Sequence, residues 1–268
     1  MKGFHTSRKI ILISFSLMSF SLSTAWSSRL PTQDIPKMEF DNSTLEGRLL
    51  KIFKSAQSED DVKLARSLAL QHGGASISAL IRVMKDSRFP DNSRWSATFL
   101  LTQIAGKKSA PVLKQFLNHP NWLMKVASLK ALLALGATEY GQEYARLLED
   151  QSLLVRAQAL ENIRHLRLKD YAPNVWAMLY DEENYNQVEG RYRRGDLIRT
   201  VILTIGDLEF NEAKEPLLRM VQQDRYNDIF REMNYSLEKI TGRNPPSQGE
   251  KQIVRRFWQR VAVSFANI

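Results

Sequence analysis

The sequence predicts an all-α protein: a right-handed α-solenoid of about five to six helix pairs, closed by a C-terminal capping helix. Three observations support this prediction. Glycine and proline are scarce, at 12 and 9 of 268 residues, which argues against a loop-rich β fold. Basic residues and helix-ending residues recur at a spacing near 31. Apolar residues within each period follow the helical repeat.

Residues 1–25 have the composition of a secretory signal peptide. Met1–Lys9 is basic without an acidic residue, residues 10–22 are apolar or serine, and Ser23-Thr24-Ala25 supplies small residues at a cleavage site. We expect cleavage after Ala25 and a periplasmic or secreted protein. An uncleaved N-terminal anchor is the alternative, although the apolar run is short for a spanning helix.

Residues 26–44 contain Pro31 and Pro36 and read as an extended polar lead-in to the repeats, which span 45–246. The chain has no cysteine, so disulfides and thiolate metal sites are excluded. Its formal net charge is +9, and the predicted leader carries three of the positive charges. The remaining bias is moderate and predicts solubility, or attraction to an anionic envelope polymer or membrane surface, rather than nucleic-acid binding.

The period is visible in five copies of a basic residue followed, eleven or twelve positions later, by a helix-ending residue. The copies are Arg94/Gly106, Lys125/Gly136, Arg156/Arg167, Arg194/Gly206 and Arg231/Gly242, with a weaker early copy at Lys63/Gly74. Pro111, Pro173 and Pro216 lie near the start of the preceding segment, where proline is tolerated in the first turn of a helix. Each copy therefore predicts a pair of helices.

The second helix of each pair is amphipathic. Within residues 153–166, Val155, Ala159, Leu160 and Ile163 lie at helical spacing on one face. Small residues at such positions let neighbouring helices approach closely. One helix pair cannot bury its apolar face alone, so stacking of successive pairs is expected to build a continuous core.

Residues 149–160 resemble bacterial HEAT repeats, including the phycobilisome-lyase type. In that family an Asp in the turn and an Arg on the second helix form a ladder along the stack. Asp150/Arg156 and Asp224/Arg231 match this pattern, whereas Asn118/Lys125 and Asp181/Arg194 are degraded copies. The resemblance covers residues 45–242 and implies about five to six HEAT-like pairs; HEAT proteins include scaffolds, adaptors and a few enzymes.

Residues 247–268 predict the C-terminal capping helix, in Glu250–Ala266. Ile253, Phe257 and Val261 recur every four residues, and Val254, Trp258 and Phe265 widen this stripe. The basic pair Arg255-Arg256 gives the same helix a character that suits anionic membranes. Docking onto the last repeat is favoured over membrane contact, because a solenoid needs a cap.

The fourth pair carries about seven extra residues between its helices, and this insert spans 182–193. Insertions in repeat proteins emerge on one face and often bind partners. Tyrosine and arginine dominate many interfaces, so Tyr185, Arg191, Tyr192 and Arg193 are predicted partner-binding residues. A solvated loop that has drifted in sequence is the alternative. We expect deletion of 183–190 to leave helicity and melting nearly unchanged.

The second helices are expected to line a concave face. Positions outside the apolar stripe predict an exposed polar surface there, formed by Lys130, Gln158, Glu161, Arg164 and His165. Such a surface suits a peptide or protein partner, and ordinary helix solvation explains it equally well.

Catalysis and metal binding have little support. The four histidines are scattered, and no pair lies at metal-ligand spacing. We find no nucleophile elbow and no phosphate-binding glycine loop. No cofactor is expected. The preferred hypothesis is a non-catalytic binding scaffold; the alternatives are an envelope-associated structural protein that uses its basic C-terminal helix, and a lyase-like HEAT enzyme, which the predicted leader disfavours.

Overall fold

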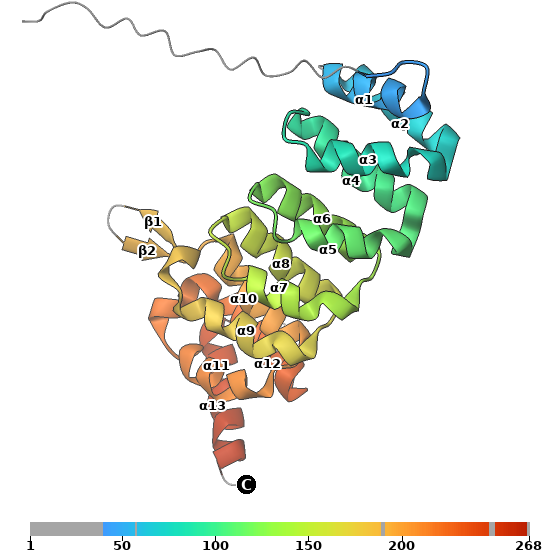
Figure 1. Cartoon of the computed structure of the whole chain (residues 1–268). Coiled ribbons are helices and arrows are strands. Elements are labelled where there is room, and N and C mark those ends of the chain that lie inside the picture. The colour runs from blue at the N-terminus through green and yellow to red at the C-terminus, as the bar shows by residue number, and fades with distance from the viewer. Residues whose placement is uncertain (1–39, 57, 189–190, 247–249, 267–268) are drawn as a thin grey trace, which may run out of the picture. The chain divides into compact units, whose positions relative to one another are not determined.

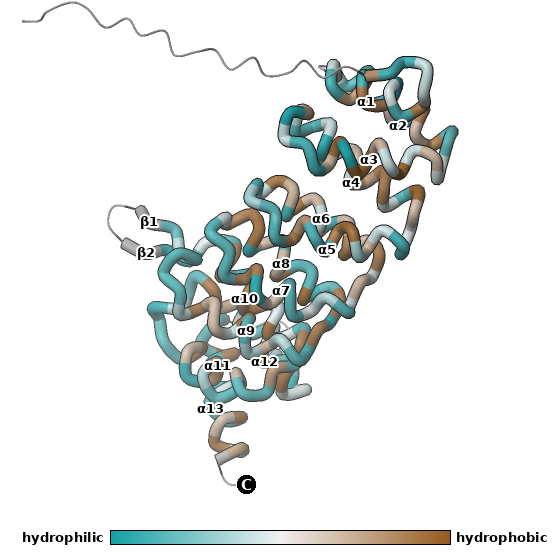
Figure 2. Tube along the Cα trace, in the orientation of Figure 1, coloured by the Kyte–Doolittle hydropathy of each residue, from teal (hydrophilic) through white to brown (hydrophobic). Residues whose placement is uncertain are grey.

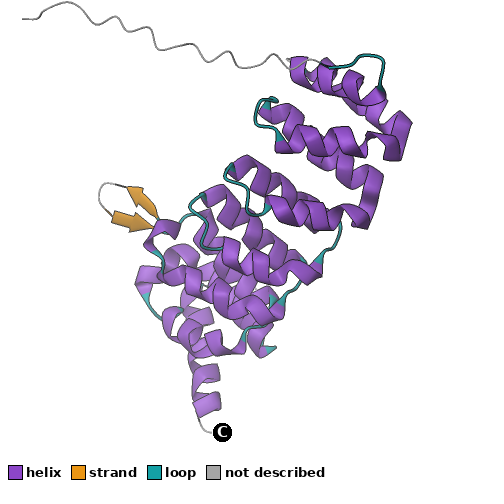
Figure 3. Ribbon diagram, viewed as in Figure 1, coloured by secondary structure: helices purple, strands orange, loops and turns teal. Residues whose placement is uncertain are grey.

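The computed structural model describes residues 40–56, 58–188, 191–246 and 250–266. The predicted leader and most of the predicted lead-in lie outside these ranges. Helices, most of them α and some short 3-10, dominate the described residues, and the only strands among them form one two-stranded hairpin, which confirms the all-α prediction in its broad form (Figures 1 and 3).

The helices follow one another as six pairs and a final helix. The pairs are α1 (Leu45–Ser55) with α2 (Glu59–His72), α3 (Ile77–Lys85) with α4 (Asp91–Ala105), α5 (Ala110–Phe116) with α6 (Trp122–Ala134), α7 (Gly141–Leu147) with α8 (Leu153–His165), α9 (Ala172–Ala177) with α10 (Asp196–Asp207), and α11 (Lys214–Met220) with α12 (Phe230–Thr241). Strands β1 (Asn186–Val188) and β2 (Arg191–Arg193) lie between α9 and α10, and α13 (Lys251–Ala266) ends the series.

The two helices of each pair contact one another, and the second helices also contact their neighbours in chain order. Thus α2 packs on α4, α4 on α6, α6 on α8, α8 on α10 and α10 on α12 (Figure 1). Figure 2 shows hydrophobic positions recurring along each helix, as this packing requires. The core is rich in leucine and alanine, and Leu113, Leu129, Leu160 and Ala159 are fully buried.

Polar side chains reinforce the contacts between second helices. The hydroxyl of Ser236 donates to the carbonyl of Ile202 at 2.6 Å, and the amide of Asn162 donates to the carbonyl of Leu129 at 2.8 Å. Both donors are fully buried. A buried polar group that is hydrogen-bonded avoids a desolvation penalty, so these bonds fix the position of one helix on the next.

The predicted helix ends are partly wrong. Gly136, Arg167 and Gly242 take positive φ where expected, but Glu209 does so in the fifth pair, with a φ of 55°, instead of Gly206. Gly206 lies inside α10, where an added Cβ would come 2.7 Å from the Cα of Ser236. This glycine is required by the close approach of α10 and α12 rather than by a helix end.

A small hydrogen-bonded turn recurs between the first and the second helix in four successive pairs. The side chain of Asp150 accepts the backbone N–H of Ser152, two residues on, at 2.9 Å. The same bond is made by Asp86 to Arg88, by His119 to Asn121, and by Asp181 to Glu183, each at 3.0 Å. The repeat therefore places His119, not Asn118, in the position equivalent to Asp150.

In four successive pairs a basic residue reaches the turn of the next pair, and we call these contacts the turn ladder; three of these residues lie on the second helix, and Arg194 lies just before α10. Arg94 contacts His119, Lys125 contacts Asp150, Arg156 contacts the backbone carbonyl of Glu183, and Arg194 contacts Asp228. The turn carboxylates pair with cations outside their own helix pair. The Asp150 carboxylate pairs with Lys125, and Asp224 pairs with Arg255 rather than Arg231.

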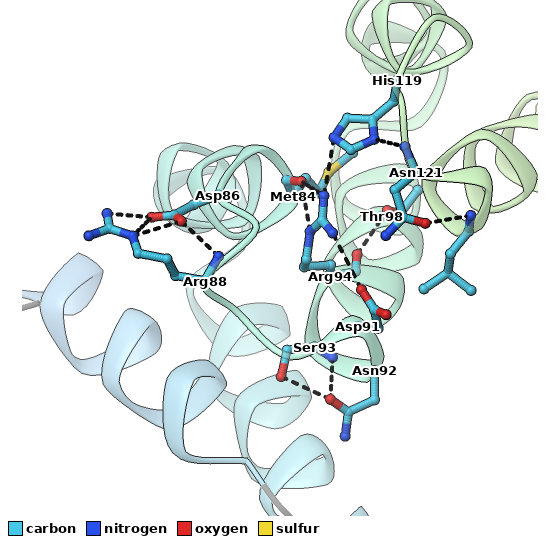
Figure 4. Close-up of polar contacts among 11 residues, drawn as sticks. Met84, Asp86, Arg88, Asp91, Asn92, Ser93, Arg94, Thr98, His119 and Asn121 are labelled. Carbon is cyan, nitrogen blue, oxygen red and sulfur yellow. Dashed lines mark hydrogen bonds and ion pairs between the residues drawn. The ribbon is translucent and has the colours of Figure 1, made fainter. Parts of the chain in front are cut away.

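The first rung, drawn in Figure 4, has the most buried cation of the four. Arg94 is 1% exposed, and its guanidinium donates to the carbonyl of Met84 and forms an ion pair with Asp91 at 3.4 Å. Its Nη2 lies 3.2 Å from Nε2 of His119. A buried charge is costly unless its donors are satisfied, and here the Met84 carbonyl and the Asp91 carboxylate supply acceptors.

Helix α13 packs on α11, as a capping helix would. Its buried face is formed by Val254, Trp258 and Val261, and the indole N–H of Trp258 donates to Asn234 at 2.8 Å. Ile253 was predicted to lie in the core stripe, but it is 39% exposed. The buried stripe of α13 is therefore shifted by about one residue from the predicted one, and it is centred on Trp258, the largest side chain of this helix.

Candidate functional site

The insert and the second helix of the preceding pair form one groove. It has a volume of about 520 Å³ and lies between the start of α8, the insert and the start of α10. Its lining residues are Leu153, Leu154, Ala157, Glu161, Glu183, Asn184, Tyr185, Asn186, Gly195, Asp196, Leu197 and Thr200. The insert and the second helix α8, which were predicted as separate binding regions, therefore share a single surface.

The wall of the groove on the insert side is anchored. The amide of Asn184 donates to the carbonyl of Met178 at 2.9 Å, and the hydroxyl of Tyr185 donates to the carbonyl of Leu179 at 2.7 Å. Asn184 is 3% exposed, and burial raises the pKa of the Tyr185 hydroxyl. The first part of the insert is therefore built into the fold and is not a freely solvated loop.

The second part of the insert is the hairpin. Strands β1 and β2 are antiparallel, with Asn186 opposite Arg193 and Val188 opposite Arg191. Figure 3 shows it projecting away from the helices. A short hairpin was not predicted, because three-residue strands give too little alternation of apolar and polar residues to be recognised.

Arg156 joins α8 to the insert. Its Nη2 donates to the carbonyl of Glu183 at 2.9 Å, and its Nη1 donates to the carbonyl of Asp150 at 2.7 Å. Its Nη1 also lies 3.8 Å from the Glu183 carboxylate, which is largely exposed. The side chain of Arg156 is nearly buried, so the turn ladder holds the insert in place beside the groove.

The wall on the α8 side is apolar and open. Leu153 and Leu154, the first two residues of α8, are 48% and 53% exposed. Single exposed leucines are common on proteins, but two adjacent ones at the mouth of a groove are typical of an interaction site. No sequence prediction named them, although both lie off the core stripe of their helix, which was a usable signal.

The predicted site residues are only partly brought together. Tyr185 and Glu161 line the groove, whereas Lys130 on α6, and Arg164 and His165 on α8, do not. Arg164 is paired with Asp207, and His165 Nε2 lies 2.8 Å from the Glu161 carboxylate. Lys130 is exposed as predicted, and so is Arg193 in β2. The side chains of Arg191 and Tyr192 lie outside the described residues.

The prediction that Gln158 is exposed is wrong. Gln158 is 9% exposed, and its amide donates to the side chain of Asn162 at 3.0 Å. Helix α8 is contacted by both α6 and α10. Less of its surface is therefore exposed to solvent than the spacing of its apolar residues predicts.

The described side chains contain no cluster of three or more His, Asp or Glu residues placed to hold a metal ion. Within the described ranges, no helix combines the length and apolar character needed to cross a membrane. Searches of protein-family models and of curated proteins find no match to this chain.

Proposed function

We propose that this chain is an exported, non-catalytic scaffold of the HEAT-like kind, in which a right-handed solenoid binds a segment of a partner protein in the groove between α8, the insert and α10. The site would hold its ligand by surface complementarity, with no covalent step and no cofactor. Export, to the periplasm or beyond the cell, rests on the predicted leader in residues 1–25.

The solenoid part of the proposal is supported by the order of the contacts. In its stronger contacts with other second helices, each second helix packs only on the second helices of the adjacent pairs. The turn ladder repeats a contact from a cation to the next turn in consecutive pairs. Repeat proteins in which each unit contacts its neighbours have this pattern. Six pairs followed by a capping helix also agree with the expected repeat number.

The binding part of the proposal depends on one observation: Leu153 and Leu154 are half-exposed beside a groove whose opposite wall is fixed. A pre-formed apolar groove binds with a small ordering cost, because neither wall has to fold first. Its volume suits a few side chains of an extended or helical segment better than a large domain surface.

A photo-crosslinking amino acid at position 154 tests this proposal. Leu64 on α2 provides a matched control, since it is a leucine with 58% exposure on a different pair. We expect the probe at 154, in cells of the source organism, to yield a discrete adduct that the probe at 64 does not. The same adducts from both positions, or none from either, would contradict a binding site in this groove.

The alternative, contact with lipid or an anionic polymer, is supported by one feature of α13. Arg256 and Arg260 are exposed on its outer face beside Ile253 and Val263, which are 39% and 57% exposed. Basic amphipathic helices bind anionic membranes. Flotation with anionic vesicles distinguishes the two functions: this alternative predicts salt-sensitive flotation that Arg256→Glu/Arg260→Glu abolishes and that Leu154→Ser leaves unchanged.

A further inference from the structure

The groove carries a charge opposite to that of the whole chain. Glu161, Glu183 and Asp196 line it, and none of its lining residues is Lys or Arg. The chain as a whole has a formal net charge of +9. Such local reversal of sign sets which ligands the groove attracts, because the nearest charges dominate at separations below the Debye length of about 8 Å.

The three carboxylates are only weakly neutralised. Glu183 is 3.8 Å from a guanidinium nitrogen of Arg156, but its side chain is 75% exposed. Glu161 is paired with an exposed histidine. The Asp196 carboxylate has no ion-pair partner among the described side chains, and it lies in the first turn of α10. Each carboxylate is therefore open to a cation from outside the chain.

Asn184 adds an independent observation. Its amide nitrogen is bonded to Met178, but its Oδ1 is buried and has no hydrogen-bond partner. Most buried polar atoms are paired, so Asn184 Oδ1 is an unsatisfied acceptor in the wall of the groove. Because Oδ1 is buried, an N–H group of a ligand would reach it only after the Asn184 side chain shifts.

The geometry points to a partner segment that carries apolar residues flanked by Lys or Arg. The apolar residues would lie against Leu153 and Leu154, and the cations would lie beside Glu183 and Asp196. This inference deepens the proposed function and rests on it. It commits to a cationic segment of another protein; a second copy of this chain, docking through the basic outer face of α13, would be a different result.

Three fluorescent synthetic peptides test the inference with the full chain. They share length and a central run of leucines, and their flanking positions are Lys, Gln or Glu. We expect the Lys peptide to bind about tenfold more tightly than the Gln peptide at low salt, and the Glu peptide to bind least. Nonspecific attraction to a positively charged chain would produce the reverse order of affinities. The ranking of the three peptides therefore distinguishes binding in the groove from attraction to the net charge of the chain.

Matched variants locate the effect. Glu183→Gln/Asp196→Asn should weaken the Lys peptide about fivefold to tenfold and leave the Gln peptide unchanged. The control Glu139→Gln/Asp170→Asn removes the same charge from exposed positions outside the groove and should have no such effect. Leu154→Ser should weaken all three peptides.

The outcomes distinguish failure of the cationic-segment inference from failure of the proposed binding function. Equal binding of the Lys and Gln peptides, still lost in Leu154→Ser, would overturn the cationic segment and leave the binding groove intact. Binding that Leu154→Ser does not affect, or no binding at all, would overturn both. Concentration-dependent self-association that Arg256→Glu/Arg260→Glu and Glu183→Gln/Asp196→Asn both abolish would show that the occupant is a second copy.

Discussion

His119 Nε2 lies 3.2 Å from the guanidinium of Arg94, while Nδ1 of the same ring accepts the backbone N–H of Asn121 at 3.0 Å (Figure 4). Both ring nitrogens thus face donors, although a neutral imidazole has only one acceptor nitrogen. In the next pair, Asp150 meets the equivalent two donors with two carboxylate oxygens. The first rung of the ladder is therefore under-satisfied, and it contains a titratable group.

We expect His119 to make stability depend on pH. Burial, and then the charges of Arg94 and Lys125, lower the pKa of His119. The folded state therefore binds fewer protons than the unfolded state, so stability is lost as pH falls below about 6.5, the ordinary pKa of histidine. Melting followed by circular dichroism should fall more between pH 7.5 and 5.5 in the native protein than in His119→Asn. Parallel curves for the two proteins would contradict this role.

Replacing His119 by aspartate should stabilise the protein. A carboxylate offers an acceptor to both donors and pairs with the buried Arg94, as Asp150 does with Lys125. We expect a gain of about 1 kcal/mol in the free energy of unfolding, measured by urea denaturation at pH 7.5. His119→Ala is the control and should lose about 1–3 kcal/mol, since it leaves a buried donor without a partner.

Arg167→Gly should also stabilise the protein. Arg167 has a φ of 52°, which side chains with a Cβ adopt at a cost of about 1 kcal/mol. We expect the melting temperature to rise by about 2–4 °C. Arg167→Ala removes the same side chain but keeps the strained backbone, so it should melt with the native protein. A rise in both variants would assign the effect to the lost charge instead.

Gly206→Ala should be strongly destabilising, because its Cβ would meet the backbone of Ser236 at 2.7 Å. We expect a loss of about 1–3 kcal/mol, the usual cost of overpacking. Gly74→Ala is the matched control: it lies in a short 3-10 helix with open space around it and should be nearly neutral. Equal effects of the two substitutions would mean that α10 and α12 can separate at little cost.

The insert should prove structural in its first half only. Tyr185→Phe removes the bond to Leu179 and should cost about 1 kcal/mol, whereas Arg193→Ala, at an exposed position, should cost almost nothing. Deletion of 183–190 removes the Arg156 contact as well, so we now expect it to lower the melting temperature, contrary to the prediction from sequence. Unchanged melting of that deletion would show that Arg156 finds other acceptors.

The sequence predicts the helix pairs well because their signals are local. The prolines of the first helices, the recurring basic residues and the apolar stripes each depend on residues within one turn or one pair. Gly206 was wrongly assigned to a helix end, where Glu209 has the positive φ, because the close approach of α10 and α12 is a property of two pairs. Gln158 was misassigned for the same reason, since a neighbouring helix covers a face that periodicity leaves free.

The groove was predicted only through its insert. Tyr185 and Glu161 were named, but their shared surface depends on Arg156 reaching 27 residues along the chain to Glu183. Leu153 and Leu154 were identifiable as apolar residues off the core stripe, and Asp196 was visible only as an acidic residue that opens a helix. Their common position beside the insert could not be read from spacing.

The turn ladder also has a kinetic consequence. Its rungs join residues only 25 to 34 positions apart, so the contact order of this chain is low for its length. Folding can then begin at any pair and spread outward, and amide hydrogen exchange should be slowest in the central pairs and fastest at the two ends. A nascent chain can therefore fold pair by pair from its N-terminal side, because each new turn is engaged by a cation that precedes it in the chain.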